Sequence, residues 1–199
     1  LDEQGRRVVD GAALAALALP LAACTPGEPG QTATASSSPT ASTSTPSESP
    51  TETVDPEVAA AEAAILESYR GYWATKVVFF ADPQNDPGTE LETYAIDTGL
   101  TDVYSAVLSY RSNGIYMAGE PVLHPEVSDI VVGDAGTATI TDCVDVADWQ
   151  PYYQDSNESA AAPGQATDVL TISAAEVYAG RGVISSSTVD RDTPCAPGE

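Results

Sequence analysis

The chain has 199 residues, of which 30 are Asp or Glu and 7 are Lys or Arg, so its formal net charge is −23. This length fits one small domain plus additional segments. The charge argues against nucleic-acid binding, which needs clustered Lys and Arg to neutralise phosphates, and against electrostatic attachment to an anionic membrane surface.

Residues 1–23 have the pattern of an export signal. Arg6 and Arg7 precede a short apolar run, residues 12–23, that Pro20 interrupts. The run is too short for a membrane-spanning helix, which needs about 20 apolar residues. We therefore expect residues 1–23 to be a signal peptide that is removed.

The residues at the end of this run, Leu21-Ala22-Ala23-Cys24, resemble the lipobox of bacterial lipoproteins. The resemblance implies that Cys24 is acylated and becomes the mature N-terminus, held at the extracytoplasmic face of the cell membrane by two or three acyl chains. The alternative is an ordinary signal peptide in which Cys24 is incidental. Removal of residues 1–23 leaves 27 acidic and 5 basic side chains, a net charge of −22.

Residues 24–55 are dominated by Ser, Thr, Pro and Gly. Between Gln31 and Glu52, 16 of 22 residues are Ser, Thr or Pro. Such a segment buries too little apolar surface to offset its ordering entropy, so we expect a disordered tether. A flexible coil of this length spans roughly 30 Å, which would space the folded domain from the membrane.

Residues 56–199 are expected to fold as one domain that begins with a long helix. Asp55 is a typical N-cap and Pro56 a typical first helical residue, and the helix should run to Ala81. Its apolar residues recur every three or four positions, which predicts a core-facing stripe. An aromatic box for a cofactor is the alternative reading of the same side chains, but helical spacing already explains them. The stripe consists of Val58, Ala61, Ile65, Tyr69, Tyr72, Trp73, Val77 and Phe80.

Two further helices are predicted. The capping-box pattern Thr89-Glu90-Leu91-Glu92 predicts a short second helix over residues 89–96. The apolar spacing of residues 98–112 predicts a third, which Asn113-Gly114 would end.

The pattern after Gly114 changes to strands. In the strand over residues 136–149, Ala138, Ile140, Asp142 and Val144 share one face. Helices followed by hairpin strands predict an α+β domain in which three helices pack on a curved antiparallel sheet of about four strands. The other expected strands are 115–123 and 127–132, as one strand bent at His124-Pro125 or as two, then 167–178 and 182–189.

Three cysteines are present, and Cys24 is assigned to the lipid. Cys143 and Cys195 therefore remain as an even pair in an exported chain, which predicts a disulfide. The bond would close a loop of about 50 residues and contribute roughly 4 kcal/mol. A metal site is not expected, because two cysteines and one histidine, His124, do not supply a zinc shell.

Several segments together resemble a known family: Gly114-Ile115, residues 119–122, residues 138–145 and the closing residues 191–195. They are similar to those of secreted actinobacterial lipoproteins of the NTF2-like (SnoaL-like) superfamily. The resemblance implies a cone, in which a curved sheet wraps a long helix and opens at its wide end. Relatives use this opening as an active site, a ligand pocket or a docking surface, so the family does not dictate a function.

Catalytic chemistry has one weak candidate, Asp142, which could point into the cone as a general base. An Asp beside a disulfide cysteine is more commonly a structural hydrogen-bond acceptor, and His124 is more commonly a surface or capping residue. No pattern for a Ser or Cys nucleophile, a phosphate loop or a calcium loop is present, so no cofactor is expected.

Aromatic side chains are the remaining binding candidates, because tyrosine and tryptophan combine an apolar face with a polar tip. The alternative is that they pack over the helices. The candidates are Tyr94, Tyr104, Tyr110, Tyr116, Trp149, Tyr152 and Tyr153.

We therefore expect a non-enzymatic, lipid-anchored extracytoplasmic domain that docks a protein partner or binds a ligand, as an accessory subunit of a membrane or envelope complex. The alternative is a small-molecule enzyme or carrier that uses an NTF2-like pocket with Asp142 as base. A deep apolar cavity around a buried carboxylate would favour the enzyme, and a filled interior would favour docking.

Overall fold

Helix α1 (Pro56–Ala81) is the longest element of the computed structural model, which describes residues 55–197. The predicted signal peptide, Cys24 and nearly all of the tether lie outside the described residues. The helix begins where the sequence predicts, because an Asp55 side-chain oxygen accepts a hydrogen bond of 2.8 Å from the Glu57 N–H and Pro56 occupies the first turn. The predicted range 56–81 is confirmed.

One face of α1 carries large side chains that are buried in the core. The prediction that its aromatic residues are core residues is confirmed, since Tyr69, Tyr72, Trp73 and Phe80 are each at most 6% exposed. The other buried residues of the helix are Ile65, Ser68, Thr75, Lys76 and Phe79.

The prediction of a second α-helix over residues 89–96 is wrong, and with it the count of three helices. Only a 3-10 turn, η1 (Glu90–Thr93), forms there, and Thr89 makes no capping hydrogen bond. The backbone that follows bonds to a strand instead: Ile184 N–H donates to the Tyr94 carbonyl and Ile96 N–H donates to the Ile184 carbonyl. These bonds use the backbone groups that a continuing helix would need.

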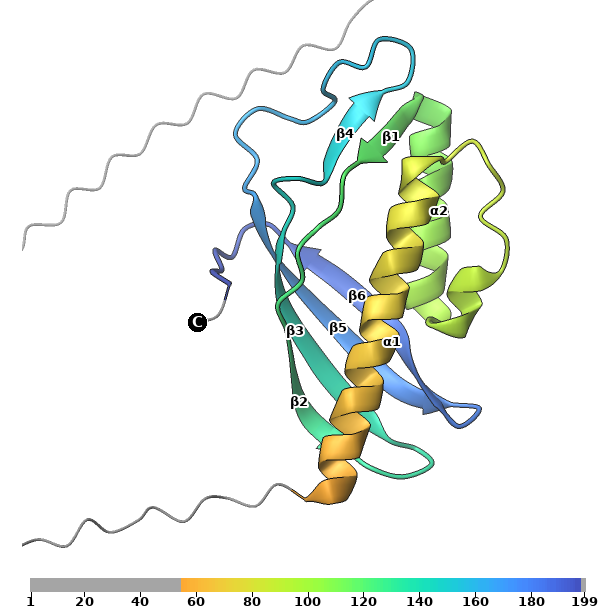
Figure 1. Cartoon of the computed structure of the whole chain (residues 1–199), viewed down its shortest axis with the longest axis vertical. Coiled ribbons are helices and arrows are strands. Elements are labelled where there is room, and N and C mark those ends of the chain that lie inside the picture. The colour runs from red at the N-terminus through yellow and green to blue at the C-terminus, as the bar shows by residue number, and fades with distance from the viewer. Residues whose placement is uncertain (1–54, 198–199) are drawn as a thin grey trace, which may run out of the picture. The chain divides into compact units, whose positions relative to one another are not determined.

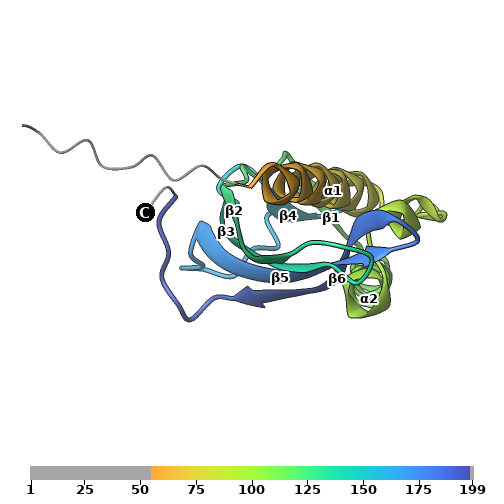
Figure 2. The same cartoon turned by 90° about the horizontal axis from the view of Figure 1, so that it is seen from below.

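The third predicted helix is confirmed as α2 (Asp97–Asn113). Gly114 ends it with φ of 62°, the left-handed conformation that glycine adopts without strain. Figure 2 shows α2 beside the edge strand β6, whereas α1 lies over one face of the main sheet.

The main sheet has four antiparallel strands in the order β2-β3-β5-β6 (Figure 1). They are β2 (Pro125–Val131), β3 (Thr137–Asp145), β5 (Asp168–Tyr178) and β6 (Arg181–Asp190). The face of β3 that was predicted to be buried is buried, from Ala138 at 5% exposed to Val144 at 1%. The α+β class with an antiparallel sheet of about four strands is therefore confirmed, with two α-helices in place of three.

A second, two-stranded sheet pairs β1 (Ile115–Ala118) with β4 (Gln150–Tyr153). The strands predicted at 115–123 and 127–132 are therefore two strands in different sheets. The strand predicted over 136–149 ends at Asp145, and β4 was not predicted. Gly119, with φ of 83°, allows the chain to turn away after β1, because a Cβ there would lie 1.7 Å from the Asp148 carbonyl oxygen.

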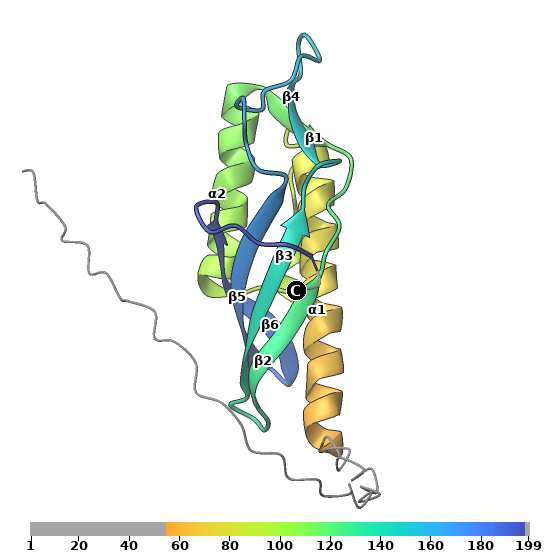
Figure 3. The ribbon, with the colours of Figure 1, turned by 90° about the vertical axis from the view of Figure 1, so that its left-hand side faces the viewer.

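The C-terminal segment crosses the face of the sheet opposite α1, as Figure 3 shows. The predicted disulfide between Cys143 and Cys195 is present and holds this segment on β3. None of the helices within residues 55–197 is long and apolar enough to cross a membrane.

Candidate functional site

Asp142, the weak catalytic candidate, lies inside the domain with no exposed surface. One of its carboxylate oxygens accepts a hydrogen bond of 2.7 Å from the His124 backbone N–H, which is the structural role that the sequence favoured. Burial raises the pKa of Asp142, and its contacts with His124 and the Tyr69 hydroxyl oppose that shift.

Tyr69, which interacts with Asp142, belongs to a cluster of aromatic side chains in the core. Trp73 contacts Tyr69 edge-on with ring centroids 6.4 Å apart, and it contacts Trp149 in the same way at 5.7 Å. Trp149 in turn meets Phe80 at 6.0 Å. A carboxylate enclosed in this way has no surface from which to reach a substrate.

The structure brings two of the predicted binding residues together on the small sheet. Tyr116 of β1 and Tyr152 of β4 are register partners, with ring centroids 6.0 Å apart. The Tyr116 hydroxyl donates to an oxygen of the Asn157 side chain at 3.1 Å. Tyr153, at the end of β4, is 41% exposed.

The other aromatic candidates lie elsewhere and pack within the fold. Tyr104 stacks on Phe79, and its hydroxyl donates to the Gly88 carbonyl at 2.8 Å. Tyr94 lies directly over Gly71 of α1, where an added Cβ would lie 2.2 Å from its ring. The aromatic residues therefore do not form one site.

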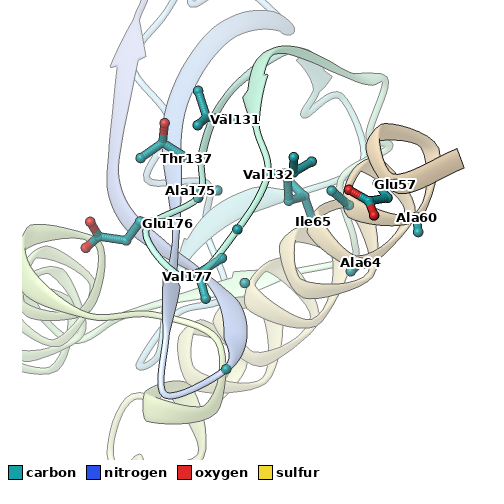
Figure 4. A pocket seen from close by; sticks show the side chains of 15 residues that line it. Glu57, Ala60, Ala64, Ile65, Val131, Val132, Thr137, Ala175, Glu176 and Val177 are labelled. Carbon is teal, nitrogen blue, oxygen red and sulfur yellow. The ribbon is translucent and has the colours of Figure 1, made fainter. Parts of the chain in front are cut away.

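An apolar groove of about 400 Å³ lies at the opposite end of α1 from the filled interior, and the sequence did not predict it. One wall is the first turns of α1, with Ala60, Ala61, Ala64 and Ile65 (Figure 4). The other wall comes from the ends of the β2–β3 and β5–β6 hairpins. It consists of Val131, Val132, Gly133, Gly136, Thr137, Ala175, Glu176, Val177, Gly180 and Gly182.

Small residues keep this groove open. Alanines occupy the helical wall, so no long side chain bridges the two walls. Gly182 faces Ile65, whose Cγ1 would lie 3.8 Å from a Cβ at that position. Gly136 is fixed by close backbone approach, because a Cβ there would lie 2.6 Å from the Val131 carbonyl oxygen.

The groove is apolar and carries only negative charge. None of the described residues that line it is Lys, Arg or His. Glu57 extends from the first turn of α1 toward Val132 in Figure 4, whereas the Glu176 carboxylate points away. Val131 and Val132 are 56% and 43% exposed, so this wall leaves apolar surface to solvent.

One feature of the sequence could have indicated the groove. Residues 59–64 of α1 are alanine at five of six positions, whereas the helix beyond Ser68 is rich in aromatic residues. The apolar spacing predicted that Ala61 is a core residue, but Ala61 is only partly buried. Within residues 55–197, no group of three or more His, Cys, Asp or Glu side chains could hold a metal ion.

No protein-family model and no curated protein matches the chain. Among solved structures, the chain is similar to the intermembrane space region of the chloroplast protein ARC6, with a TM-score of 0.39 and 13% identity. This match covers 66% of the present chain and 95% of the other. A similarity at this level carries no conclusion about function.

Proposed function

We propose that the chain is a non-enzymatic, lipid-anchored extracytoplasmic domain that docks a partner protein through the apolar groove, as an accessory subunit of a membrane or envelope complex. The observation that carries the proposal is the groove itself. The domain is filled by aromatic residues along the second half of α1, yet it leaves an apolar channel along the first half. An apolar channel with exposed valines is typical of an interaction site.

The location rests on three features. The lipobox resemblance implies an acyl anchor on Cys24, which precedes Asp55 by 31 positions. The Cys143–Cys195 disulfide fits an oxidising compartment outside the cytoplasm. Because the groove is lined by the first turns of α1, it belongs to the end of the domain that is joined to the tether.

The chemistry of the groove points to one kind of occupant, an apolar segment of an envelope or membrane protein that is flanked by Lys or Arg. Apolar side chains would fill the channel, and basic flanks would meet Glu57 and the negative field of a chain with a net charge of −22 after processing. A second copy of this chain would bring the same negative charge. An anionic lipid headgroup would be repelled in the same way.

The enclosed interior supports docking over catalysis. An isomerase, cyclase or carrier that used Asp142 as base would need a cavity at that carboxylate, whereas Asp142 is 0% exposed among aromatic rings. The NTF2-like resemblance is compatible with docking, because the family uses its scaffold for several unrelated purposes.

Native mass spectrometry of the full chain, gently extracted from its own membranes, tests the proposal. We expect acyl mass on the Cys24 peptide and a co-extracted protein. Ala61→Trp, which fills the groove, should remove that protein, and Ala63→Trp, on the exposed face of the same helix, should retain it. Loss of the protein in both variants, its retention in both, or an unmodified Cys24 would contradict the proposal.

A further inference from the structure

A second cavity, of about 530 Å³, lies where the small sheet, the end of α2 and the C-terminal segment meet. Its volume is in the range of small-molecule binding sites. It shares no lining residue with the groove, so it can be tested independently of the docking function. The residues that matter for its chemistry are Tyr110, Met117, Trp149, Gln150, Gln165 and Arg191.

The floor of this cavity is apolar and well packed. Tyr110 meets Phe80 edge-on with ring centroids 4.9 Å apart, and Trp149 is held between Phe80 and Trp73. Met117 of β1 is 7% exposed. These rings are fixed by the core, so they offer a preformed surface for an apolar or aromatic body.

Among the described residues that line this cavity, Arg191 supplies the one positive charge. Of the three other arginines of the described domain, Arg111 and Arg181 are engaged by hydrogen bonds, whereas Arg70 on α1 is not. Arg111 donates to the Pro83 and Asn85 carbonyls, and Arg181 donates to the Thr93 carbonyl. Hydrogen bonds between described residues do not engage Arg191 in this way, although the chain is strongly acidic.

The carboxylate of the neighbouring acid, Asp190, is engaged by the turn that follows it. It accepts hydrogen bonds from the Asp192 and Thr193 N–H groups at 2.9 and 3.1 Å, and from the Thr193 hydroxyl at 2.7 Å. These bonds lower the pKa of Asp190 and hold its carboxylate within a turn. Four residues after Arg191, Cys195 is tied to Cys143, so the turn and the disulfide fix the backbone that carries the guanidinium.

Arg191 and Tyr110 act on the same part of the cavity. Both side chains line this cavity. Burial raises the pKa of Tyr110, and the positive charge of Arg191 opposes that shift. A guanidinium and a phenol hydroxyl beside an aromatic floor are complementary to a carboxylate on an apolar body.

We infer that this cavity binds a small organic carboxylate with an aromatic or branched apolar body. The carboxylate would be held by Arg191 and Tyr110, and the body would lie on Trp149 and Met117. One guanidinium balances one carboxylate, whereas each further negative charge on the ligand would be repelled by the acidic surface, so a singly charged ligand is favoured.

Calorimetric titration of the full chain carrying Cys24→Ser, with phenylacetate and with the uncharged 2-phenylethanol, tests this inference. Phenylacetate should bind at least about tenfold more tightly than the alcohol. Arg191→Gln should abolish this preference, whereas Arg181→Gln, at an arginine that is also exposed but lies outside the cavity, should preserve it.

The circular dichroism spectrum of each variant shows whether its fold is intact. Equal affinity for the two probes, no binding of phenylacetate at millimolar concentration, or a preference that survives Arg191→Gln would each overturn the inference.

Discussion

The two halves of helix α1 differ in the size of the side chains that they turn toward the sheet. From Tyr69 to Phe80 the helix carries aromatic rings that fill the space above β3, and the domain is closed there. From Glu57 to Ile65 it carries mostly alanine against glycine-containing hairpins, and the domain is open there. The same helix thus closes one end of the fold and leaves a groove at the other.

This difference separates stability from binding. The closed half buries the large apolar surfaces that drive folding, whereas the open half leaves Val131 and Val132 exposed beside the groove. Changes in the closed half should therefore alter the free energy of unfolding, and changes in the open half should alter docking alone.

Tyr69→Ala should show the largest effect on the closed half. Tyr69 is fully buried among aromatic rings, so its removal leaves a cavity and should lower the free energy of unfolding by about 3–5 kcal/mol. Urea denaturation measures the change. Tyr69→Phe is the matched control, because it keeps the ring and removes only the hydroxyl that interacts with Asp142, and it should have much less effect. An equal loss of unfolding free energy in the two variants would show that Tyr69 stabilises the fold through its hydroxyl and not through the packing of its ring.

Lys76→Met should change how stability depends on pH. Lys76 is buried with its ammonium 3.6 Å from the centre of the Trp73 ring, and burial lowers its pKa from 10.5 to about 7. Between these two values the unfolded chain binds more protons than the folded one, so stability rises with pH. The native chain should gain about 3 kcal/mol between neutral pH and about pH 9.5.

The Lys76→Met variant should lack that gain and should be more stable than the native chain at neutral pH. Denaturation curves of both chains at the two pH values provide the measurement. A native chain whose stability does not rise with pH would show that the amine reaches solvent.

Asp142 should show a smaller effect that depends on the replacement. Asp142→Ala leaves the His124 N–H without an acceptor and should cost about 1–3 kcal/mol, whereas Asp142→Asn keeps an oxygen at that position. Because the folded pKa of Asp142 is raised, its contribution to stability is present at acidic pH and declines as pH rises through that folded value. Asp142→Asn should remove this decline, as thermal unfolding between about pH 4 and neutral pH would show. An Asn variant as unstable as the Ala variant would contradict the acceptor role.

Filling the groove should have the smallest effect on stability. Ala61 is partly buried beside open space, so Ala61→Trp should change the free energy of unfolding by less than about 1 kcal/mol. The exposed Ala63→Trp should behave alike. Thermal unfolding of the two variants makes the comparison, and a large loss in Ala61→Trp alone would mean that the groove belongs to the core.

Local signals predicted the parts of the fold that local chemistry controls. The Asp55 cap and the apolar spacing placed α1, and the Asn113-Gly114 pair ended α2. The cysteine count predicted the pairing of Cys143 with Cys195.

Features that depend on contacts between residues far apart in the sequence were not predicted from local patterns. The helix expected at 89–96 is lost because its backbone bonds to Ile184, far along the chain. The small sheet was missed because β1 pairs with β4 rather than continuing into β2. The groove was not predicted because it exists where side chains are small. Alanine in a helix is found both in packed cores and beside open space, so it does not distinguish the two.

Site-specific photocrosslinking in the protein's own cells tests the docking claim most directly. A benzophenone amino acid would replace Ala61 in the groove or, as the control, Ala63 on the exposed face. The account predicts that position 61 alone captures one protein, and that the attached peptide is apolar and flanked by Lys or Arg. Equal capture from both positions, or capture of lipid alone at position 61, would contradict it.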